Sequence, residues 1–208
     1  MHSVEVEVAG RRHAVELRAR RGLRARRLAA PPVLDGTLDE WGEPASVTAL
    51  DGLGPVPASV QQTRAWLGYD GTALYLAFRC AEDRMEQLRA SVREADGMVW
   101  EDDDVAVFLD PGASRGTYFQ LEINALGTVY DARNDDRSWA SGARTGARRA
   151  GDGWALEVAI PWTMLGRAPA PGERWGINLG RQEKPHAQTS AVAPTFKEAA
   201  AFADLVFE

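Results

Sequence analysis

The sequence predicts an all-β protein, specifically an antiparallel, jelly-roll-like β-sandwich. Short segments that alternate apolar and polar residues recur along the chain, and Gly, Pro, Asn and Asp fill the gaps between them. Helical patterning is scarce and is limited to 84–94 and one turn at Pro161–Leu165. Short strands separated at close intervals by turn residues are typical of sandwiches and jelly rolls. The expected strands lie at 63–69, 73–80, 104–110, 117–125, 127–133, 143–149, 153–160, 174–182 and 201–207.

Residues 1–30 differ from the rest of the chain in pattern and in charge. Val4–Val8 and Ala14–Arg18 alternate around Gly10, which predicts two strands joined by a turn. Eight arginines against three glutamates give this segment a charge of +5, so the other residues carry −11 within the total of −6. A short arginine run is weak evidence for nucleic-acid binding, and the acidic total argues against that partner. We interpret 1–30 as a basic β-hairpin and linker and 31–208 as the sandwich domain.

Composition narrows the class of protein further. Of the 208 residues, 45% are hydrophobic, which suits one packed domain and argues against global disorder. No apolar run reaches the roughly 18 residues that a membrane helix requires, so no membrane partner is expected. Cys80 is the only cysteine, so we expect no intrachain disulfide and a small buried side chain at that position. The N-terminus lacks a signal-peptide core, so either the chain is cytoplasmic or an exporting region has been removed.

The tryptophans divide into a core group and one candidate platform. Trp100 precedes the acidic stretch Glu101–Asp104, and an indole at such a polar position indicates a surface for a flat ligand. In 118–124 the even-numbered residues form a polar face opposite the apolar odd-numbered ones. This combination favours a binding module over an enzyme. The tryptophans expected in the core are Trp41, Trp66, Trp154, Trp162 and Trp175.

Three motifs taken together resemble carbohydrate-binding module family 9. They are Asp35–Trp41, with its Asp-Gly-Thr-Leu-Asp-Glu-Trp sequence, the acidic strand in Trp100–Asp110, and the closing Phe202–Phe207. The resemblance covers about 33–208 and implies an antiparallel sandwich that binds a poly- or oligosaccharide without catalysing a reaction. It also implies a domain that often belongs to a larger, secreted glycan-degrading protein, and hence an extracellular or periplasmic location.

The resemblance further implies which residues contact the sugar. In sugar-binding members, a tryptophan before the acidic strand and an aromatic residue before the last strand sandwich a terminal sugar. Trp100 and Phe196 match these positions. The C–H faces of a pyranose are flat and apolar, so each aromatic contact contributes about 0.5–1.5 kcal/mol beyond area burial. The strand pattern itself, rather than the resemblance, supplies the expected partners of the sugar hydroxyls from the polar side of the sheet, namely Glu122, Asn124 and Arg181.

The chain departs from the family pattern at three positions. Ala106 stands where a carboxylate commonly follows the valine of the acidic strand, and Ala193 where a polar residue precedes the second aromatic. Glu122 stands where the best-known members carry a basic residue. Loss of hydroxyl partners weakens the orientation and selectivity of a bound ligand. A structural or interaction domain without a ligand is therefore the first alternative.

Other residues raise metal, haem and catalytic alternatives. Glu101–Asp104 offers the carboxylate oxygens that calcium prefers, and the resembled family often carries structural calcium, so Asp103 is the expected ligand. Some similar sandwich domains bind haem through methionine with histidine or lysine. No motif selects a carboxylate pair, a phosphate loop or a nucleophile, so no catalytic residue is expected. The residues available for haem are Met85, Met98, Lys184 and His186.

Overall fold

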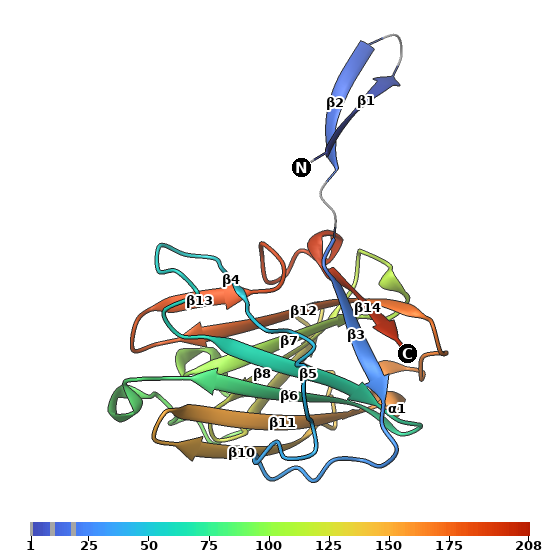
Figure 1. Cartoon of the computed structure of the whole chain (residues 1–208). Coiled ribbons are helices and arrows are strands. Elements are labelled where there is room, and N and C mark those ends of the chain that lie inside the picture. The colour runs from blue at the N-terminus through green and yellow to red at the C-terminus, as the bar shows by residue number, and fades with distance from the viewer. Residues whose placement is uncertain (1, 9–10, 18–19) are drawn as a thin grey trace.

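The computed structural model describes residues 2–8, 11–17 and 20–208 and consists almost entirely of β-strands (Figure 1). Near the N-terminus, β1 (His2–Val8) and β2 (Arg11–Leu17) pair antiparallel and form a sheet of their own. The two N-terminal strands expected from the sequence are therefore present. The expected turn at Gly10 and the expected strand end at Arg18 lie outside the described residues.

The other strands form one continuous sheet whose two halves enclose the core. The path is β10–β11–β6–β5–β3–β14–β12–β7–β8–β9, and β3 (Gly22–Arg27) joins the halves by running parallel to both β5 and β14. In Figure 1, β5, β6, β11 and β10 lie side by side in that order. The first half comprises β10 (Arg144–Ala150), β11 (Gly153–Pro161), β6 (Ala73–Ala81) and β5 (Thr63–Tyr69). The second comprises β14 (Ala203–Phe207), β12 (Arg174–Glu183), β7 (Asp104–Asp110), β8 (Phe119–Asn124) and β9 (Val129–Arg133).

All nine strands expected for the sandwich are present, with ends that differ by a few residues. The short strands β4 (Asp51–Gly52) and β13 (Gln188–Ala191), which pair with each other, were not expected. The segment 84–94 forms only the 3₁₀ turn η1 (Met85–Gln87), whereas the turn after Pro161 is the helix α1 (Trp162–Leu165). Further 3₁₀ turns are η2 (Val99–Glu101), η3 (Pro111–Ala113) and η4 (Ala199–Ala201). No helix in the described part of the chain is long and apolar enough to span a membrane.

Strand β3 moves the start of the sandwich from the expected residue 31 to Gly22. The strand is rich in arginine, but its apolar and charged residues alternate, so that one face is apolar and the other is charged. Leu23 and Ala25 point inward and are 2% and 0% exposed, while Arg24 reaches outward to Glu208. Because arginine carries an apolar stem, such a strand can pack well and still present charge to solvent.

The space between the two halves is filled by aliphatic and aromatic side chains. Val105, Val107 and Leu109 of β7 face Leu76 and Phe78 of β6 within one cluster of buried residues. The predicted burial of Cys80 is confirmed, since it is fully buried. The five tryptophans expected in the core are all at most 7% exposed, namely Trp41, Trp66, Trp154, Trp162 and Trp175.

Glu157 on β11 fixes the segment that carries the Asp-Gly turn. Its fully buried carboxylate accepts hydrogen bonds from Trp41 Nε1 at 2.7 Å, from Gly36 N at 2.8 Å and from Asp35 N at 3.0 Å. Three donors compensate a buried negative charge that would otherwise be costly to desolvate. The motif Asp35–Trp41 is thus explained by its contacts with one carboxylate.

Replacing Glu157 with glutamine should therefore destabilise the fold. The amide nitrogen would face a donor, and a buried unsatisfied group costs about 1–3 kcal/mol. We expect Glu157→Gln to lower the free energy of unfolding in urea by that amount. The exposed Glu94→Gln should change it by less than about 0.5 kcal/mol. Equal stability of the two variants would contradict the role assigned to Glu157.

Candidate functional site

The face of β7, β8 and β12 that points away from the core, called the outer face below, has a flat floor. Ala106 on β7 pairs with Glu122 on β8 and with Gly180 on β12. Small residues at two of these three positions leave room above the sheet. The ring of Phe196 lies over Gly180, where a Cβ atom would come within 2.4 Å of Phe196 Cε1.

A loop from β13 toward β14 places Phe196 above this floor. Asn178 on β12 accepts a hydrogen bond from Ala193 N at 2.9 Å and donates one to Thr195 O at 2.8 Å. Phe196 stacks on Phe108, with ring centroids 6.1 Å apart and planes inclined by 22°. Asn178 thus holds the loop down, and Phe108 supports one face of the Phe196 ring.

Trp100 borders a hollow of about 260 Å³ on the outer face. The Trp100 ring contacts Tyr130 edge-on, with centroids 5.1 Å apart. The guanidinium of Arg137 lies 5.6 Å from the centroid of Trp100 and 5.3 Å from that of Tyr130. Trp100 and Tyr130 therefore form an aromatic side of the hollow, and the Arg137 guanidinium makes cation–π contacts with both rings. The lining residues are Trp100, Gln120, Glu122, Tyr130, Asp135, Arg137 and Lys197.

Gln120 and Glu122 contribute to the lining of this hollow, and each has one buried oxygen to which no described residue donates a hydrogen bond. Gln120 Nε2 donates to Glu122 Oε1 at 2.8 Å, whereas Gln120 Oε1 and Glu122 Oε2 have no partner among the described residues. Both side chains are at least 94% buried, and burial raises the pKa of Glu122 above its usual range. At the rim, Lys197 Nζ pairs with Asp135 Oδ1 at 2.6 Å.

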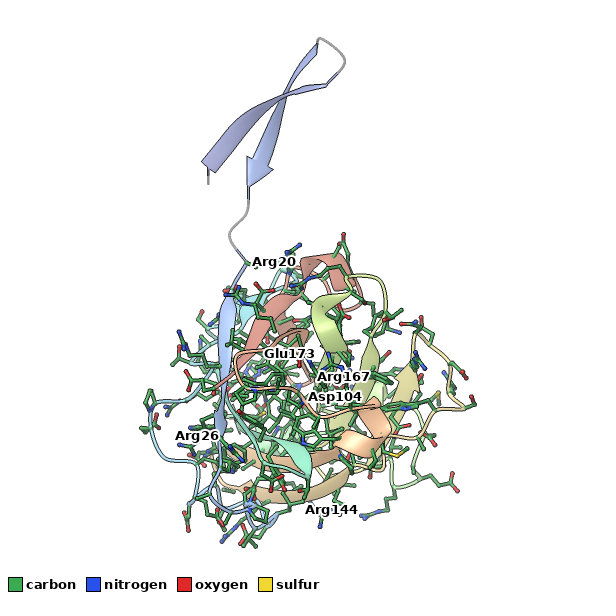
Figure 2. The ribbon with its side chains drawn as sticks, turned by 90° about the vertical axis from the view of Figure 1, so that its right-hand side faces the viewer. Arg20, Arg26, Asp104, Arg144, Arg167 and Glu173 are labelled. Atoms are coloured by element: carbon green, nitrogen blue, oxygen red, sulfur yellow. The ribbon has the colours of Figure 1, made fainter. Side chains whose placement is uncertain are left out.

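Asp104 lies beneath this region and is fully buried, in the interior of the molecule in Figure 2. It pairs across the strands with Asn124 and Gln182, yet neither of its oxygens has a hydrogen-bond partner among the described residues. Burial first, and then the negative charge of Glu122, raise the pKa of Asp104 well above its ordinary value. Asp104 and Glu122 are therefore two neighbouring buried carboxyl groups whose pKa values are both raised by burial.

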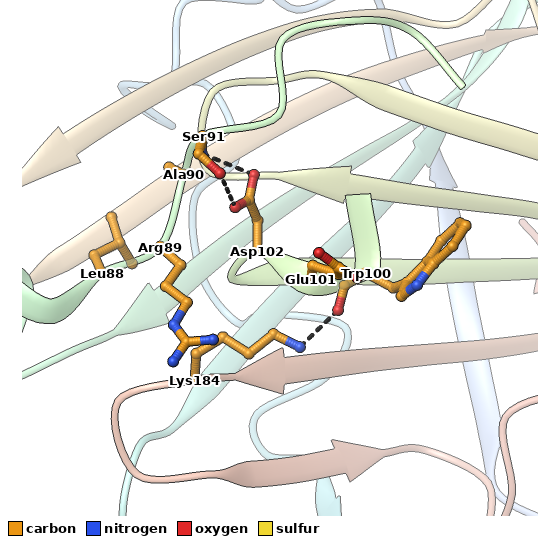
Figure 3. A pocket seen from close by; sticks show the side chains of 8 residues that line it. All are labelled: Leu88, Arg89, Ala90, Ser91, Trp100, Glu101, Asp102 and Lys184. Atoms are coloured by element: carbon orange, nitrogen blue, oxygen red, sulfur yellow. Dashed lines mark hydrogen bonds between the residues drawn. The ribbon is translucent and has the colours of Figure 1, made fainter. Parts of the chain in front are cut away.

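A second hollow, of about 670 Å³, lies on the other side of Trp100 (Figure 3). Lys184 Nζ donates to Trp100 O at 2.6 Å, and Asp102 accepts from Ser91 N at 2.9 Å. These bonds fix the backbone around Trp100, while Figure 3 shows its indole pointing away from Leu88. Trp100 therefore contributes to the lining of both hollows, and these hydrogen bonds hold the backbone around it.

The sequence of this domain matches a known protein family. The family model described as carbohydrate family 9 binding domain-like matches residues 34–198. The chain belongs to this family. No curated protein matches the chain. The membership confirms the resemblance drawn from the motifs and assigns the domain to the carbohydrate-binding modules.

Solved structures of family 9 modules have the same fold. A module from Caldicellulosiruptor kristjanssonii in complex with cellotriose is 17% identical, covers 90% of this chain and 94% of its own, and gives a TM-score of 0.69. In its complex with glucose the same kind of module gives 0.66 at 18% identity, over 89% and 95% of the two chains. A candidate carbohydrate-binding protein from Bacteroides uniformis gives 0.74 at 18% identity, over 91% and 100%. These likenesses confirm the predicted β-sandwich.

The structure brings some of the expected ligand contacts together and separates others. Trp100 and Glu122 line the same hollow, whereas Phe196 is not one of its lining residues and packs over Gly180 and Phe108. Asn124 is fully buried, and its Nδ2 donates to Val92 O at 2.8 Å and Asp102 Oδ2 at 2.9 Å. Its Oδ1 accepts two backbone N–H groups. Asn124 therefore supports the loops around the site rather than offering free hydrogen bonds to a ligand.

Arg181 is not on the outer face at all. It shares the inward side of β12 with Leu179 and is fully buried, and its Nη1 donates to Ala81 O at 2.8 Å. Its Nη2 lies 3.6 Å from Glu82 Oε2. The sheet separates Arg181 from the hollow, so we drop it from the proposed ligand contacts.

The sequence interpretation missed several residues of the hollow. Tyr130 lies within the expected strand 127–133, but its neighbour Trp100 is remote in sequence. Asp135, Arg137 and Lys197 were not singled out as site residues. Only Gln120 carried a usable signal, because it shares the polar face of its strand with Glu122.

A buried carboxylate cluster is the candidate cation site near the inward side of β12. Carboxylate oxygens of Glu82, Asp103 and Glu183 lie within 4.8 Å of one another, and Arg181 is their buried counter-charge. Asp103 also accepts Arg89 N at 2.8 Å and Lys184 N at 3.1 Å, so it ties two loops together. Burial raises the pKa of Asp103. Among the four acidic residues 101–104, only Asp103 belongs to a group of this kind in the described part of the chain.

Two of the residues considered for haem, His186 and Lys184, are engaged in other contacts. Both nitrogens of His186 contact carboxylates, Nδ1 that of Glu183 at 2.9 Å and Nε2 that of Asp83 at 3.1 Å. Lys184 Nζ is bound to Trp100 O, and Met98 is 55% exposed on the surface. These contacts give no support to an axial ligand pair.

Glu82 makes the cluster sensitive to pH. Burial first, and then neighbouring Glu183, raise the pKa of Glu82 to about 7. Between its ordinary value of 4.5 and about 7 the folded state keeps a proton that the unfolded state releases, so the stability of the fold falls as pH rises through this window. We expect Glu82→Gln, a mimic of the protonated acid, to gain stability over the wild type across this window, by about 1–3 kcal/mol in EDTA.

Thermal melts in EDTA at intervals from about pH 5 to pH 8 would measure this difference, and the exposed Glu86→Gln is the control. The Glu82→Gln advantage should grow with pH and level off above about pH 7, while the control stays flat. A constant difference at all pH values would contradict the proton assignment.

Proposed function

We infer that this family 9-like domain binds one sugar residue of an oligo- or polysaccharide, without catalysis, in the hollow beside Trp100. The observation that carries the inference is a hollow in which the rings of Trp100 and Tyr130 lie beside polar and charged side chains, among them Glu122, Asp135 and Lys197. A pyranose needs both, since its C–H face is apolar and its hydroxyls form hydrogen bonds.

Each lining residue has a distinct role in this proposal. Trp100 supplies the stacking surface, and Glu122 with the rim pair Asp135 and Lys197 supplies hydrogen bonds to the hydroxyls. Phe196, which packs over Gly180 outside the lining of the hollow, is proposed as the second aromatic. Because Arg137 rests on the Trp100 ring, a stacking sugar displaces a guanidinium contact worth about 0.5–1 kcal/mol at an exposed site. That cost is small, and we expect modest affinity overall.

The wider setting of the domain also belongs to this proposal. Modules of similar fold have been solved with cellotriose and with glucose, which supports glucose-configured ligands here. Within a larger glycan-degrading protein, outside the cytoplasm, such a module would hold the enzyme near its substrate. Its affinity would then add to that of the catalytic domain through a high local concentration.

Removal of the Trp100 ring should abolish most of the binding. A buried tryptophan anchor commonly contributes at least about 2 kcal/mol, so we expect Trp100→Ala to weaken binding by about thirtyfold or more. Fluorescence titration with gluco-, xylo-, manno- and galacto-configured oligosaccharides measures the effect. Trp139→Ala, which removes a half-buried ring outside this hollow, is the control. If no sugar changes the fluorescence of the wild type, the proposal is contradicted and a domain without a ligand is favoured.

Phe196 provides a separate test of the second aromatic. We expect Phe196→Ala to weaken sugar binding by about 0.5–1.5 kcal/mol, the contribution of one aromatic contact. Calorimetric titration against the best sugar of the panel gives the value, and a urea melt checks the fold. Unchanged affinity in a folded variant would mean that Phe196 only packs on Phe108.

A further inference from the structure

Arg137 brings to the hollow beside Trp100 a positive charge that no described residue neutralises. Asp135 and Lys197, which also line the hollow, are paired with each other at 2.6 Å. The Arg137 guanidinium forms no ion pair in the described part of the chain and lies against the rings of Trp100 and Tyr130. Arg137 is exposed and lines the hollow, so its N–H donors are open to a ligand there.

Glu122 does not supply the missing negative charge. It forms no ion pair with Arg137, and its carboxyl group accepts a hydrogen bond from Gln120 Nε2 at 2.8 Å. Burial raises the pKa of Glu122, which disfavours its charged form. The hollow therefore combines an unpaired guanidinium with a carboxyl group whose burial favours the neutral form, and this combination suits a ligand that carries a negative charge.

The backbone that carries Arg137 is held on both sides of this residue. Asn134 Oδ1 accepts a hydrogen bond from Tyr118 N at 2.7 Å, and Asp136 Oδ1 accepts one from Ser138 N at 2.9 Å. The side chain itself lies on two rings, and cation–π contacts of this kind are weak at an exposed site. The guanidinium can therefore turn from the rings to a ligand without a change in the loop.

A sugar that stacks on Trp100 displaces the guanidinium from that ring, and the ligand then determines what the guanidinium contacts. A neutral sugar offers it only water or a hydroxyl group. A carboxylate offers two coplanar oxygens that match the two-donor edge of a guanidinium, and such bidentate pairs are stronger than neutral hydrogen bonds. A ligand carboxylate thus compensates the lost ring contact, whereas a neutral hydroxymethyl group does not.

We propose that this hollow prefers a uronic acid residue, a hexose with a carboxylate at its C6 position, over the corresponding neutral sugar. The sugar ring stacks on Trp100, and its carboxylate accepts two hydrogen bonds from the Arg137 guanidinium. The preference rests on the proposed sugar-binding function and assigns the substrate class of the same site. A methyl-esterified residue lacks the advantage, because the ester resembles the acid in shape but carries no charge.

Calorimetric titration with three trisaccharides of one configuration tests the preference on the unaltered chain. The ligands are a β-1,4-linked trisaccharide of glucuronic acid, its methyl ester and cellotriose, at about pH 6, where an ordinary carboxyl group is charged. We expect the acid to bind about fivefold more tightly than the ester or cellotriose, which is the effect of one well-formed ion pair near the surface. Added salt should weaken the binding of the acid alone.

Arg137→Gln tests which residue causes the preference. It should weaken binding of the acid and tighten binding of cellotriose, because no guanidinium then has to leave the Trp100 ring, whereas a merely structural role of Arg137 would weaken both. The matched control is Arg133→Gln, which removes the same charge from the chain. Arg133 is also exposed and lies 5.4 Å from the centroid of the Phe119 ring, outside this hollow, so its replacement should keep the preference.

The outcomes separate this preference from the function on which it rests. Binding of a neutral sugar that equals or exceeds binding of the acid overturns the preference and leaves sugar binding intact. An advantage that the methyl ester shares, or that survives in folded Arg137→Gln, also overturns it. Failure of every sugar to bind, acidic or neutral, refutes the proposed function itself. Should Arg137→Gln not fold, the comparison of the acid with its ester on the wild type still decides the question.

Discussion

The alternation of side chains across β7, β8 and β12 is the constraint on which the site depends. Neighbouring residues of a strand point to opposite faces, so each strand gives half of its positions to the core and half to the outer face. Val105, Val107 and Leu121 fill the core, and the residues between them form the floor of the hollow. A shift of one residue in register would bury the floor and expose the core. The hydrophobic core therefore fixes the geometry of the site as firmly as it fixes the fold.

Buried carboxylates fix the backbone of loops in both halves of the sandwich. Glu157 holds the Asp-Gly turn, Asp102 holds the 91–92 backbone, Asp103 joins two loops and Glu183 accepts His186 N and Gln188 N. Each replaces the hydrogen bonds that a strand neighbour would otherwise supply to a loop backbone. Charge-assisted bonds of this kind are stronger than neutral ones, so they suit loops that must hold a ligand-binding wall in place. This explains why an acidic stretch precedes β7 in a chain where most of these acids never reach solvent.

The sequence predicted the features that depend on the alternation of side chains along a strand, and not those that depend on contacts between loops. Strand positions, the core tryptophans and the outward position of Glu122 follow from a period of two and were predicted. The position of Arg181 was predictable as well, because Trp175, Ile177 and Leu179 are inward residues of the same parity. The wall of the hollow was not predictable. Trp100, Arg137 and Lys197 come from three separate loops, and their meeting depends on tertiary contacts such as those of Asn178.

Two of the departures from the family pattern meet in one cross-strand pair. Ala106 lacks the carboxylate expected on β7, and Glu122 on β8 has a carboxylate in place of a base, and the two residues are directly opposed. Side chains in such pairs have Cβ atoms about 4.5–5.5 Å apart, so a carboxylate moved from one strand to the next stays at the same floor. The exchange keeps a carboxyl group at this position and removes a cation. A substitution on the outer face can change ligand contacts while the inward side chains keep the sheet unchanged, because the two sets of residues occupy opposite faces of the same strands.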